Sequence, residues 1–247
     1  MDYGLIELMR LDRIYFPNIS EKSTQIDDKE IFHKLKNVLR KTPGSEVLMF
    51  DGRGREYKAV ITSLQNKRIK LDNLTITSHE KEKLPKITLA FSLVKSLKVD
   101  LIFRMCTEVG IDEFIPFISL YSIISLKENK FEKKIEHYQK IIENSCEQSS
   151  RLYVPVVREV LTIKDICSRI KNYDLSYFGS YNKHSPSNRK DLNNILIIIG
   201  PEGGFTEDET NSFLSQKVLP LKASENILRA ETACVAVSTL VSHLHRK

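Results

Sequence analysis

The chain lacks the features that would assign it to a membrane or secreted class of protein. It has no apolar stretch close to the roughly 18 residues that a membrane-spanning helix needs. The first residues, Met-Asp-Tyr-Gly-Leu-Ile-Glu, show no basic region followed by an apolar core, so we expect no secretory signal. The four cysteines are scattered and form no Cys-x-x-Cys pair, which predicts reduced thiols and no disulfide framework or zinc site. These absences favour a cytoplasmic protein.

Several common catalytic signatures are also missing. There is no Gly-x-x-x-x-Gly-Lys-Ser/Thr loop and no Gly-x-Gly-x-x-Gly turn, which argues against phosphate-loop and dinucleotide enzymes. There is no Gly-x-Ser-x-Gly elbow of a serine hydrolase. His243 and His245 are two positions apart, so their rings would diverge on a helix and make a poor metal pair. We therefore expect no metal site.

What is present is the composition of a soluble globular protein. Hydrophobic residues make up 41% of the 247 positions and charged residues 28%, which suits one large domain or two smaller ones. Positive charge is concentrated in residues 34–70, which carry ten basic and only three acidic side chains. That segment has a net charge of +7, whereas the whole chain has +6. Such an excess suggests a face that binds nucleic acid, although a lysine-rich solvated surface would have the same composition.

The pattern of apolar residues divides the chain into two parts. Short runs at 47–50, 57–61 and 69–71, separated by turn signals, predict a small β-barrel or sandwich in residues 1–75, with a helix at 29–39 before the strands. The polar stretch 76–85 is expected to be a linker. After it, strands and helices alternate, which predicts an α/β domain with a parallel sheet. The expected strands cover residues 87–93, 113–117, 174–178, 195–199 and 217–221. The expected helices include residues 97–109, 132–149 and 231–243, with Gly110 at a C-cap.

Residues 195–209 are the most informative stretch. Five consecutive branched apolar residues at 195–199 predict a strand covered on both faces. Gly-Pro-Glu-Gly-Gly follows at 200–204, and Thr206 with Glu209 has the spacing of a capping box that begins a helix. A buried strand that leads through glycines into a helix is a common small-molecule site. Because the loop carries the acid Glu202 and no lysine, it favours a neutral or cationic ligand, while a tight turn without any ligand could use the same residues.

Three further clusters could carry chemistry. Residues 33–40 run from His33 to Arg40 at the end of a predicted helix, and Glu-Gln-Ser-Ser-Arg at 147–151 ends another. Ile-Leu-Arg-Ala-Glu-Thr-Ala at 227–233 enters the last helix, where Arg229 and Glu231 could close over a ligand. Each cluster has a structural alternative: a surface or capping residue, solvated polarity, and a helix start with an ion pair.

Together with Thr-Glu-Val-Gly-Ile-Asp-Glu at 107–113, these motifs resemble one family in content and in order. The chain is similar to the RsmE family of bacterial 16S rRNA (uracil-N3)-methyltransferases, in the SPOUT superfamily, over nearly its whole length. The resemblance implies an α/β fold with a PUA-like RNA-binding β-barrel at residues 1–75, a linker at 76–85 and a methyltransferase domain with a trefoil knot at 86–247. It also implies the cofactor S-adenosylmethionine (SAM), a homodimer, and a uridine of 16S rRNA in the decoding region of the small ribosomal subunit as substrate.

The resemblance also suggests roles for individual residues. Arg229 and Glu231 are the catalytic candidates, with Glu231 a hypothetical acceptor of the proton from uracil N3. The implied cofactor-binding residues are Ile199, Gly200, Pro201, Glu202, Gly203, Gly204, Ser224, Ile227, Leu228, Arg229 and Thr232. The implied RNA-binding residues are Arg13, His33, Arg40, Arg104, Gln148 and Arg151.

Three departures and two alternatives accompany this interpretation. Ser150 and Ser224 stand where the family usually has glycine, and Arg104 stands where lysine is usual. Ser224 suits the cofactor loop if its φ angle is negative. One alternative is a SPOUT methyltransferase with a different RNA target. The other is a non-catalytic RNA-binding factor in ribosome assembly, which failure to bind SAM would favour.

Overall fold

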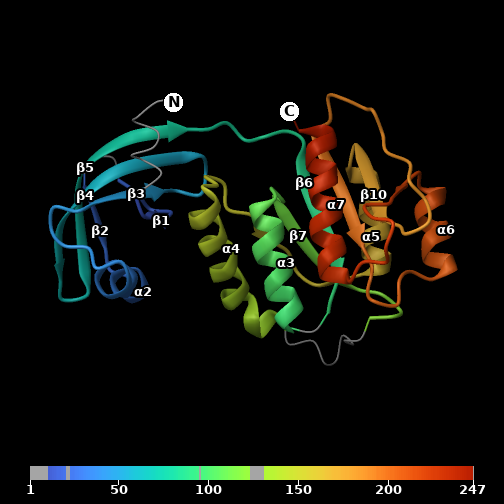
Figure 1. Cartoon of the computed structure of the whole chain (residues 1–247), viewed down its shortest axis with the longest axis horizontal. Helices are drawn as coiled ribbons and strands as arrows, with labels where there is room; N and C mark the ends of the chain where they lie inside the picture. Colours follow the sequence, from blue (N-terminus) through green and yellow to red (C-terminus); the bar gives the residue numbers. More distant parts are fainter. Residues whose placement is uncertain (1–10, 21–22, 95, 123–130, 247) are drawn as a thin grey trace. The chain divides into compact units, whose positions relative to one another are not determined.

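The computed structural model of the chain describes residues 11–20, 23–94, 96–122 and 131–246. The N-terminal residues on which we expect no secretory signal lie outside these ranges. The chain folds into two compact units (Figure 1): the first comprises Met1–Glu82 and Cys146–Val154, and the second Lys83–Ser145 and Pro155–Lys247. Within the described ranges, no helix is both long and apolar enough to cross a membrane.

The first unit is built on a mixed sheet. Its strands have the order β1-β3-β4-β5-β2, in which β1 pairs with β3 in parallel and the other pairs are antiparallel. The strands are β1 (Arg13–Tyr15), β2 (Ser23–Ile26), β3 (Glu46–Phe50), β4 (Arg55–Gln65) and β5 (Arg68–His79). Asn66 and Lys67 join β4 to β5 with φ angles of 52° and 61°. A two-residue hairpin turn of type I′ needs positive φ at both positions, so the turn signal in the sequence has a clear structural use.

One helical segment packs on this sheet. It comprises α2 (Lys29–His33) and the π-helical turn η1 (Lys34–Val38), which together confirm the predicted helix. The carboxylate of Asp28 accepts hydrogen bonds from the backbone N–H groups of Glu30 and Ile31 and so begins α2. Leu35 is fully buried in the same apolar core as Met49 and Ile69. The short strands predicted from the apolar runs are confirmed as β3, β4 and β5.

The polar stretch 76–85 is not entirely a linker. Ile76, Ser78 and His79 continue β5 and pair with Tyr57, Glu56 and Arg55 of β4. A sheet with one solvated face needs few apolar residues toward its end, so polar composition did not exclude a strand here. The chain passes from the first unit to the second after Glu82, returns to the first unit for residues 146–154, and then continues in the second.

The second unit confirms the expected α/β class with a parallel sheet. The strand order is β12-β10-β11-β6-β7-β8, with β9 also on β7, and every pairing is parallel. The strands are β6 (Lys86–Ser92), β7 (Glu113–Ile118), β8 (Val156–Val157), β9 (Leu161–Thr162), β10 (Leu175–Gly179), β11 (Asn194–Ile199) and β12 (Leu219–Leu221). β11 lies between β10 and β6, and its residues 195–199 are all buried, which explains their continuous apolar run.

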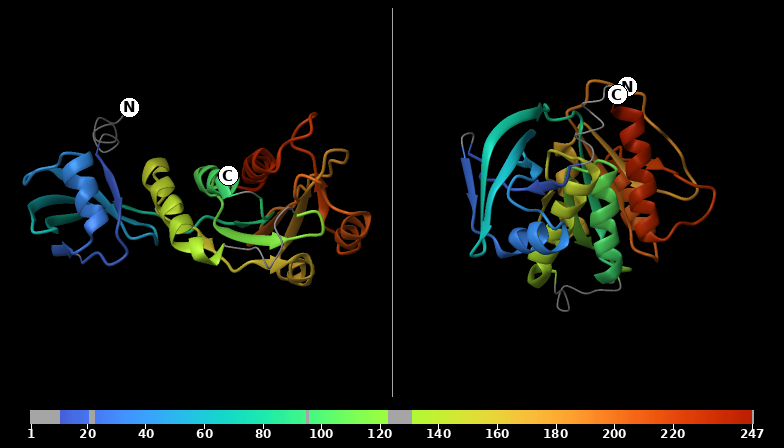
Figure 2. Two further views of the ribbon diagram at one scale, coloured as in Figure 1. Left: turned by 90° about the horizontal axis from the view of Figure 1, so that it is seen from below. Right: turned by 60° about the vertical axis from the view of Figure 1, so that its left-hand side comes forward.

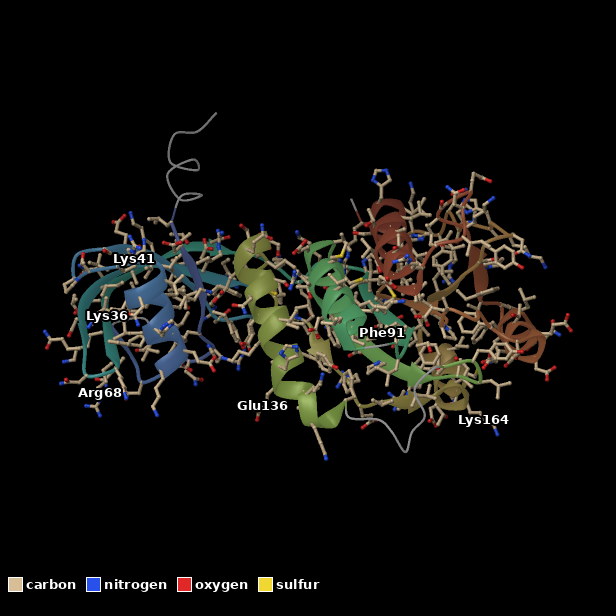
Figure 3. All side chains as sticks on the ribbon, turned by 60° about the horizontal axis from the view of Figure 1, so that its bottom comes forward. Lys36, Lys41, Arg68, Phe91, Glu136 and Lys164 are labelled. Carbon is tan, nitrogen blue, oxygen red and sulfur yellow. The ribbon has the colours of Figure 1, made fainter. Side chains whose placement is uncertain are left out.

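Helices cover both faces of this sheet. They are α3 (Ser96–Glu108), α4 (Ile135–Ser149) preceded by η3 (Glu132–Lys134), α5 (Ile163–Arg169) followed by η4 (Ile170–Asn172), α6 (Glu207–Ser215) and α7 (Ala230–His245). Figure 2 shows α3 and α7 side by side on one face and α5 on the other. Gly110 has a φ of 103° just after α3, as its C-cap position requires. Phe91 of β6, labelled in Figure 3, makes an edge-on contact with Phe103 of α3 and fixes that helix on the sheet.

Candidate active site

A cavity of about 870 Å³ lies at the carboxyl ends of β10, β11 and β12. Its wall includes residues 178–183 after β10, residues 199–205 after β11, and Leu221, Ala223 and Ser224 at the end of β12. The first residues of α7 close another side through Ala230, Ala233 and Val237. Ligands of open parallel sheets bind beyond the carboxyl ends of the strands, so the topology places a candidate ligand site here.

The glycine-rich loop at 200–204 lines this cavity, and its conformation depends on glycine. A Cβ atom on Gly200 would lie 3.1 Å from the ring of Phe205, and Gly204 has a φ of 75°. The capping box predicted from Thr206 and Glu209 is confirmed: the Glu209 N–H donates to Thr206 Oγ1 at 3.1 Å, and the Thr206 N–H donates to Glu209 Oε2 at 2.9 Å. The loop thus joins a buried strand to a capped helix, and its glycines line the cavity.

The sequence-predicted cofactor residues fall into two groups. Those in the cavity wall are Ile199, Gly200, Pro201, Glu202, Gly203, Gly204, Ser224, Ile227 and Leu228. Arg229 and Thr232 are exposed and are not part of the wall. Helical periodicity explains the position of Thr232. Ala230, Ala233 and Val237 of α7 are three and four residues apart and face the cavity, whereas Thr232 lies on another side of the helix. Among the described residues Ser224 is not one of those with positive φ, so serine fits its backbone without strain.

Lys98 of α3 supplies the cation that the loop sequence lacks. Its Nζ atom lies 2.8 Å from Oε1 of Glu202 and 3.5 Å from Oε2 of Glu231. The hydrogen bond to Glu202, followed by the attraction of both carboxylates, raises the pKa of Lys98. No pattern near the loop could have indicated this residue, because it is brought there by the packing of α3 against α7.

The two residues expected to act as a catalytic pair lie in different environments. The side chain of Glu231 is only 14% exposed, and its Oε2 is shielded from solvent without a hydrogen bond to any described residue. Arg229 is exposed at the N-cap of α7 and makes no capping hydrogen bond with its side chain. Among the ion pairs of the described residues, the partner of Glu231 is Lys98. The alternative of a simple Arg229–Glu231 ion pair is therefore not what the structure shows.

Sequence reasoning missed the wall formed after β10. Phe178, Tyr181 and Lys183 border the cavity, and the Tyr181 side chain is largely exposed at the rim. The segment follows a predicted strand, as the glycine-rich loop does. It becomes part of the site only because β10 is the neighbour of β11, and strand order is not visible in the sequence.

Arg13 and the motif at 147–151 make hydrogen bonds within the first unit. Arg13 donates from Nε to Oε1 of Glu56 at 2.5 Å and from a terminal nitrogen to Oγ of Ser150 at 2.7 Å. Glu147 accepts from the Tyr15 backbone N–H at 2.9 Å and from the Lys34 ammonium group. These contacts fasten the segment 146–154 to the sheet of the first unit.

Other expected RNA-binding residues are open to solvent. His33, Arg40 and Gln148 are exposed in the first unit, Arg151 is half-buried there, and Arg104 is exposed on α3 of the second unit. Figure 3 labels Lys36, Lys41 and Arg68 on the first unit. Part of the basic excess is neutralised by acids from outside residues 34–70: Lys41 pairs with Asp12 at 2.8 Å and Arg68 with Asp27 at 3.0 Å.

A metal centre finds no support in the described part of the chain, where no group of three or more His, Cys, Asp or Glu side chains is placed to hold an ion. His245 instead hydrogen-bonds the Tyr177 hydroxyl at 2.9 Å. Burial lowers the pKa of His245, so its neutral form is favoured in the fold.

Comparison with known sequences agrees with this architecture. Residues 80–242 match the sequence family described as the RNA methyltransferase domain, and residues 26–72 match the RNA methyltransferase PUA domain. The ribosomal RNA small subunit methyltransferase E of Rickettsia conorii is 32% identical over 241 residues, which cover 92% of this chain and 93% of the relative. The enzyme of the same name from Bacillus subtilis is 28% identical over 239 residues, covering 91% and 92%.

A solved structure gives the same result for the fold. The ribosomal RNA small subunit methyltransferase E from Neisseria gonorrhoeae, crystallised with bound S-adenosyl methionine, superimposes with a TM-score of 0.84 at 26% identity. The alignment covers 96% of this chain and 99% of that one. The first unit is thus PUA-like, and the second has the fold of the methyltransferase domain. From its sequence and its fold, the chain belongs to the ribosomal RNA small subunit methyltransferase E family.

Proposed function

We propose that this protein transfers the methyl group of SAM to N3 of one uridine in 16S rRNA, in the decoding region of the small ribosomal subunit. The observation that carries the proposal is the cavity at the carboxyl ends of β10–β12, walled by the 200–204 loop and by Ser224 to Leu228, in a chain of this family. The specificity for N3 and the place of the uridine come from the family resemblance.

The cavity fits SAM in size and chemistry. Its volume of about 870 Å³ lies within the range of about 300–1,000 Å³ that is usual for small-molecule sites. Its wall combines apolar side chains such as Phe178 and Val237 with glycine backbone, and a Cβ on Gly200 would push against Phe205. The acid Glu207 in the wall suits a sulfonium cation, whereas the charge of Glu202 is balanced by the Lys98 ammonium group. When bound, SAM would supply an electrophilic methyl carbon.

The chain's own residues would prepare the uracil for this transfer. Uracil N3 carries a weakly acidic proton, so the reaction needs a proton acceptor beside the base. Glu231 is the candidate, because its carboxylate lies in the first turn of α7, next in sequence to the wall residue Ala230, and pairs with the Lys98 ammonium group at 3.5 Å. Arg229 is exposed three residues after Asn226 of the cavity wall, and we propose that it contacts the RNA. Orientation of the base by these groups would provide much of the rate.

The first unit is proposed to bind the rRNA. Its exposed basic side chains, including Lys36, Arg40 and Lys67, suit phosphate contacts. Arg13 has a different place: its guanidinium is held by Glu56 and Ser150, so we now assign it a role in holding the fold of this unit. His33, Gln148, Arg151 and, on the second unit, Arg104 remain proposed RNA contacts.

A homodimer is proposed from the outer face of α3. Leu97, Leu101 and Met105 are spaced by four residues and are exposed, Leu97 to 80%. Ile227, beside the cavity, is 83% exposed. Such an apolar row on a soluble protein suits a partner surface, and we propose a second copy of this chain. Light scattering after gel filtration should give twice the mass of one chain, and Leu101→Glu should give monomers.

The trefoil knot stays a prediction from the family resemblance, as does the cytoplasmic location.

One experiment tests the substrate directly. Ribosomal subunits from a strain lacking this gene are incubated with the protein and with SAM that carries a tritiated methyl group, and the label is mapped on the rRNA. A label on N3 of one uridine in the decoding region supports the proposal. A label elsewhere favours a methyltransferase with another RNA target, and failure to bind SAM favours a non-catalytic assembly factor.

A further inference from the structure

The ammonium group of Lys98 joins two segments of the candidate site that are far apart in the sequence. Lys98 lies in the first turn of α3, Glu202 in the glycine-rich loop and Glu231 in the first turn of α7. Nζ of Lys98 is 2.8 Å from Glu202 Oε1 and 3.5 Å from Glu231 Oε2. All three residues belong to the second unit, so the arrangement is internal to one compact body.

The carboxylate of Glu231 depends on the ammonium group of Lys98 for its charge balance. Oε2 of Glu231 is shielded from solvent and has no hydrogen bond to the described residues, and a shielded carboxylate is costly without a nearby positive charge. The thiol of Cys234 also interacts with Glu231, but it is buried and its raised pKa keeps it neutral. Arg229 is exposed and forms no ion pair with it. Among the ion pairs of residues 11–20, 23–94, 96–122 and 131–246, Lys98 is thus the cation that faces Glu231.

Glu202 lies directly before two glycines of the loop at 200–204. Gly203 and Gly204 follow it, and Gly204 adopts a φ of 75° that other residues reach at a cost. Within the loop, Gly204 N–H donates to Pro201 O at 2.9 Å. The hydrogen bond from Lys98 to Glu202 connects the loop to α3, a regular helix that packs against α7.

We propose that Lys98 is a positioning residue that couples the cofactor loop to the proposed proton acceptor. It holds the carboxylate of Glu231 in place, and through Glu202 it restrains the loop at 200–204. The effect on Glu231 rests on the proposed methyltransferase function, whereas the restraint of the loop does not. The raised pKa of Lys98 agrees with this arrangement, because the hydrogen bond to Glu202 and the attraction of both carboxylates stabilise its ammonium form.

The loop restraint is tested without any RNA. Amide hydrogen exchange of residues 202–205 and the SAM dissociation constant, measured by calorimetry, are compared in Lys98→Met, Glu202→Gln and the double variant. Lys98→Met should speed the exchange and weaken SAM binding, each by about 2–5-fold, as for loss of a partly exposed ion pair. The losses should not add in the double variant, because both changes remove one contact. The matched control is Lys164→Met, an exposed lysine on α5 (Figure 3). If Lys98→Met behaves like this control, or if the losses add, the loop restraint is wrong.

The coupling to Glu231 is tested by single-turnover methylation of small ribosomal subunits at saturating SAM. Lys98→Met should slow the step by about 10–100-fold, because a displaced acceptor loses its alignment with the base. Lys98→Arg keeps the charge and should retain the rate within about 3-fold. Adding Lys98→Met to Glu231→Gln should slow the reaction no further than Glu231→Gln alone. An unchanged rate in Lys98→Met, or an additional loss in the double variant, would overturn the coupling.

The two parts of the experiment also separate the proposals. If the wild-type protein binds SAM but methylates no subunit, the proposed function fails, and the exchange and affinity measurements still decide the loop restraint. The thermal midpoint of Lys98→Met is compared with that of Lys164→Met, so a folding defect is recognised as such. Should Lys98→Met fold poorly, Lys98→Gln, which keeps a polar end without the charge, takes its place with the same expected losses.

Discussion

The segment at 147–151 and the loop at 200–204 are both polar motifs that stand out in the sequence, but their polar groups have different uses. Glu147 and Ser150 bind Tyr15, Lys34 and Arg13 within the first unit. The loop at 200–204 instead borders an open cavity, and its backbone approaches that space without side chains in the way. A motif whose polar atoms have internal partners supports the fold, whereas one that faces a cavity is available to a ligand. The comparison predicts that changes at the cavity alter the reaction and that changes at the 147–151 segment alter stability.

The largest expected effect is on catalysis, at Glu231, which is next in sequence to the wall residue Ala230. Glu231→Gln keeps the shape of the side chain but removes the base, so single-turnover methylation should fall by about 10²–10⁴-fold. The thermal midpoint should fall only slightly, since the neutral amide loses the ion pair with Lys98 at 3.5 Å and little else. Full methylation by this variant, measured on small ribosomal subunits, would falsify the role of Glu231.

The next effect is on the stability of the first unit. Gly54 has a φ of 101°, and a Cβ there would lie 2.5 Å from the Glu80 carbonyl oxygen and 2.6 Å from the Tyr153 hydroxyl. Gly54→Ala should lower the free energy of unfolding by about 2–4 kcal/mol, from backbone strain and steric overlap together. Gly44→Ala is the matched control, because its φ is 93° but nothing lies within 4 Å of the added atom. It should cost about 1–2 kcal/mol. Equal losses in urea denaturation would show that the contacts with Glu80 and Tyr153 are unimportant.

Glu147→Ala should have a somewhat smaller effect of the same kind. It removes the acceptor of the Tyr15 N–H and the partner of Lys34, which should cost about 1–3 kcal/mol of unfolding free energy. SAM affinity should stay within about 2-fold, since no ligand contact is lost in the second unit. Glu136→Ala, exposed near the start of the same helix α4 (Figure 3), is the control for loss of a carboxylate. A marked loss of SAM affinity in Glu147→Ala but not in the control would break the comparison drawn above.

The smallest effect concerns Ser150, where the family usually has glycine. Ser150 has a φ of 62°, and its hydroxyl accepts a hydrogen bond from Arg13. Ser150→Ala loses the hydrogen bond and keeps the strained backbone, whereas Ser150→Gly loses the bond and relieves the strain. Ser150→Gly should therefore be about 1 kcal/mol more stable than Ser150→Ala in urea denaturation. If the two variants are equally stable, the left-handed backbone carries no cost at this position.

Much of the fold could be predicted from local pattern. The run at 195–199, the capping box at Thr206 and Glu209, and Gly110 after α3 each reflect a short-range requirement, and all three are confirmed. The strand in 76–79 was missed because its pairing with β4 makes polar residues compatible with a strand. The candidate site was likewise predicted only in part. The two loops that carry motifs were identified, but the wall at 178–183 was not, since its residues form no recognisable pattern.

The sequence by itself determined the class of the longer local elements, the family, and the glycine-rich loop as a candidate ligand site without a phosphate-binding lysine. Those properties depend on residues within one or two turns of each other or on motifs in a set order. Only the tertiary structure decided that Lys98 lies between Glu202 and Glu231, that Arg13 is held by Glu56, and that residues 146–154 belong with the first unit. The physical reason is that these contacts depend on strand order and helix packing, which bring together residues separated by tens of positions and leave no periodic trace in the chain.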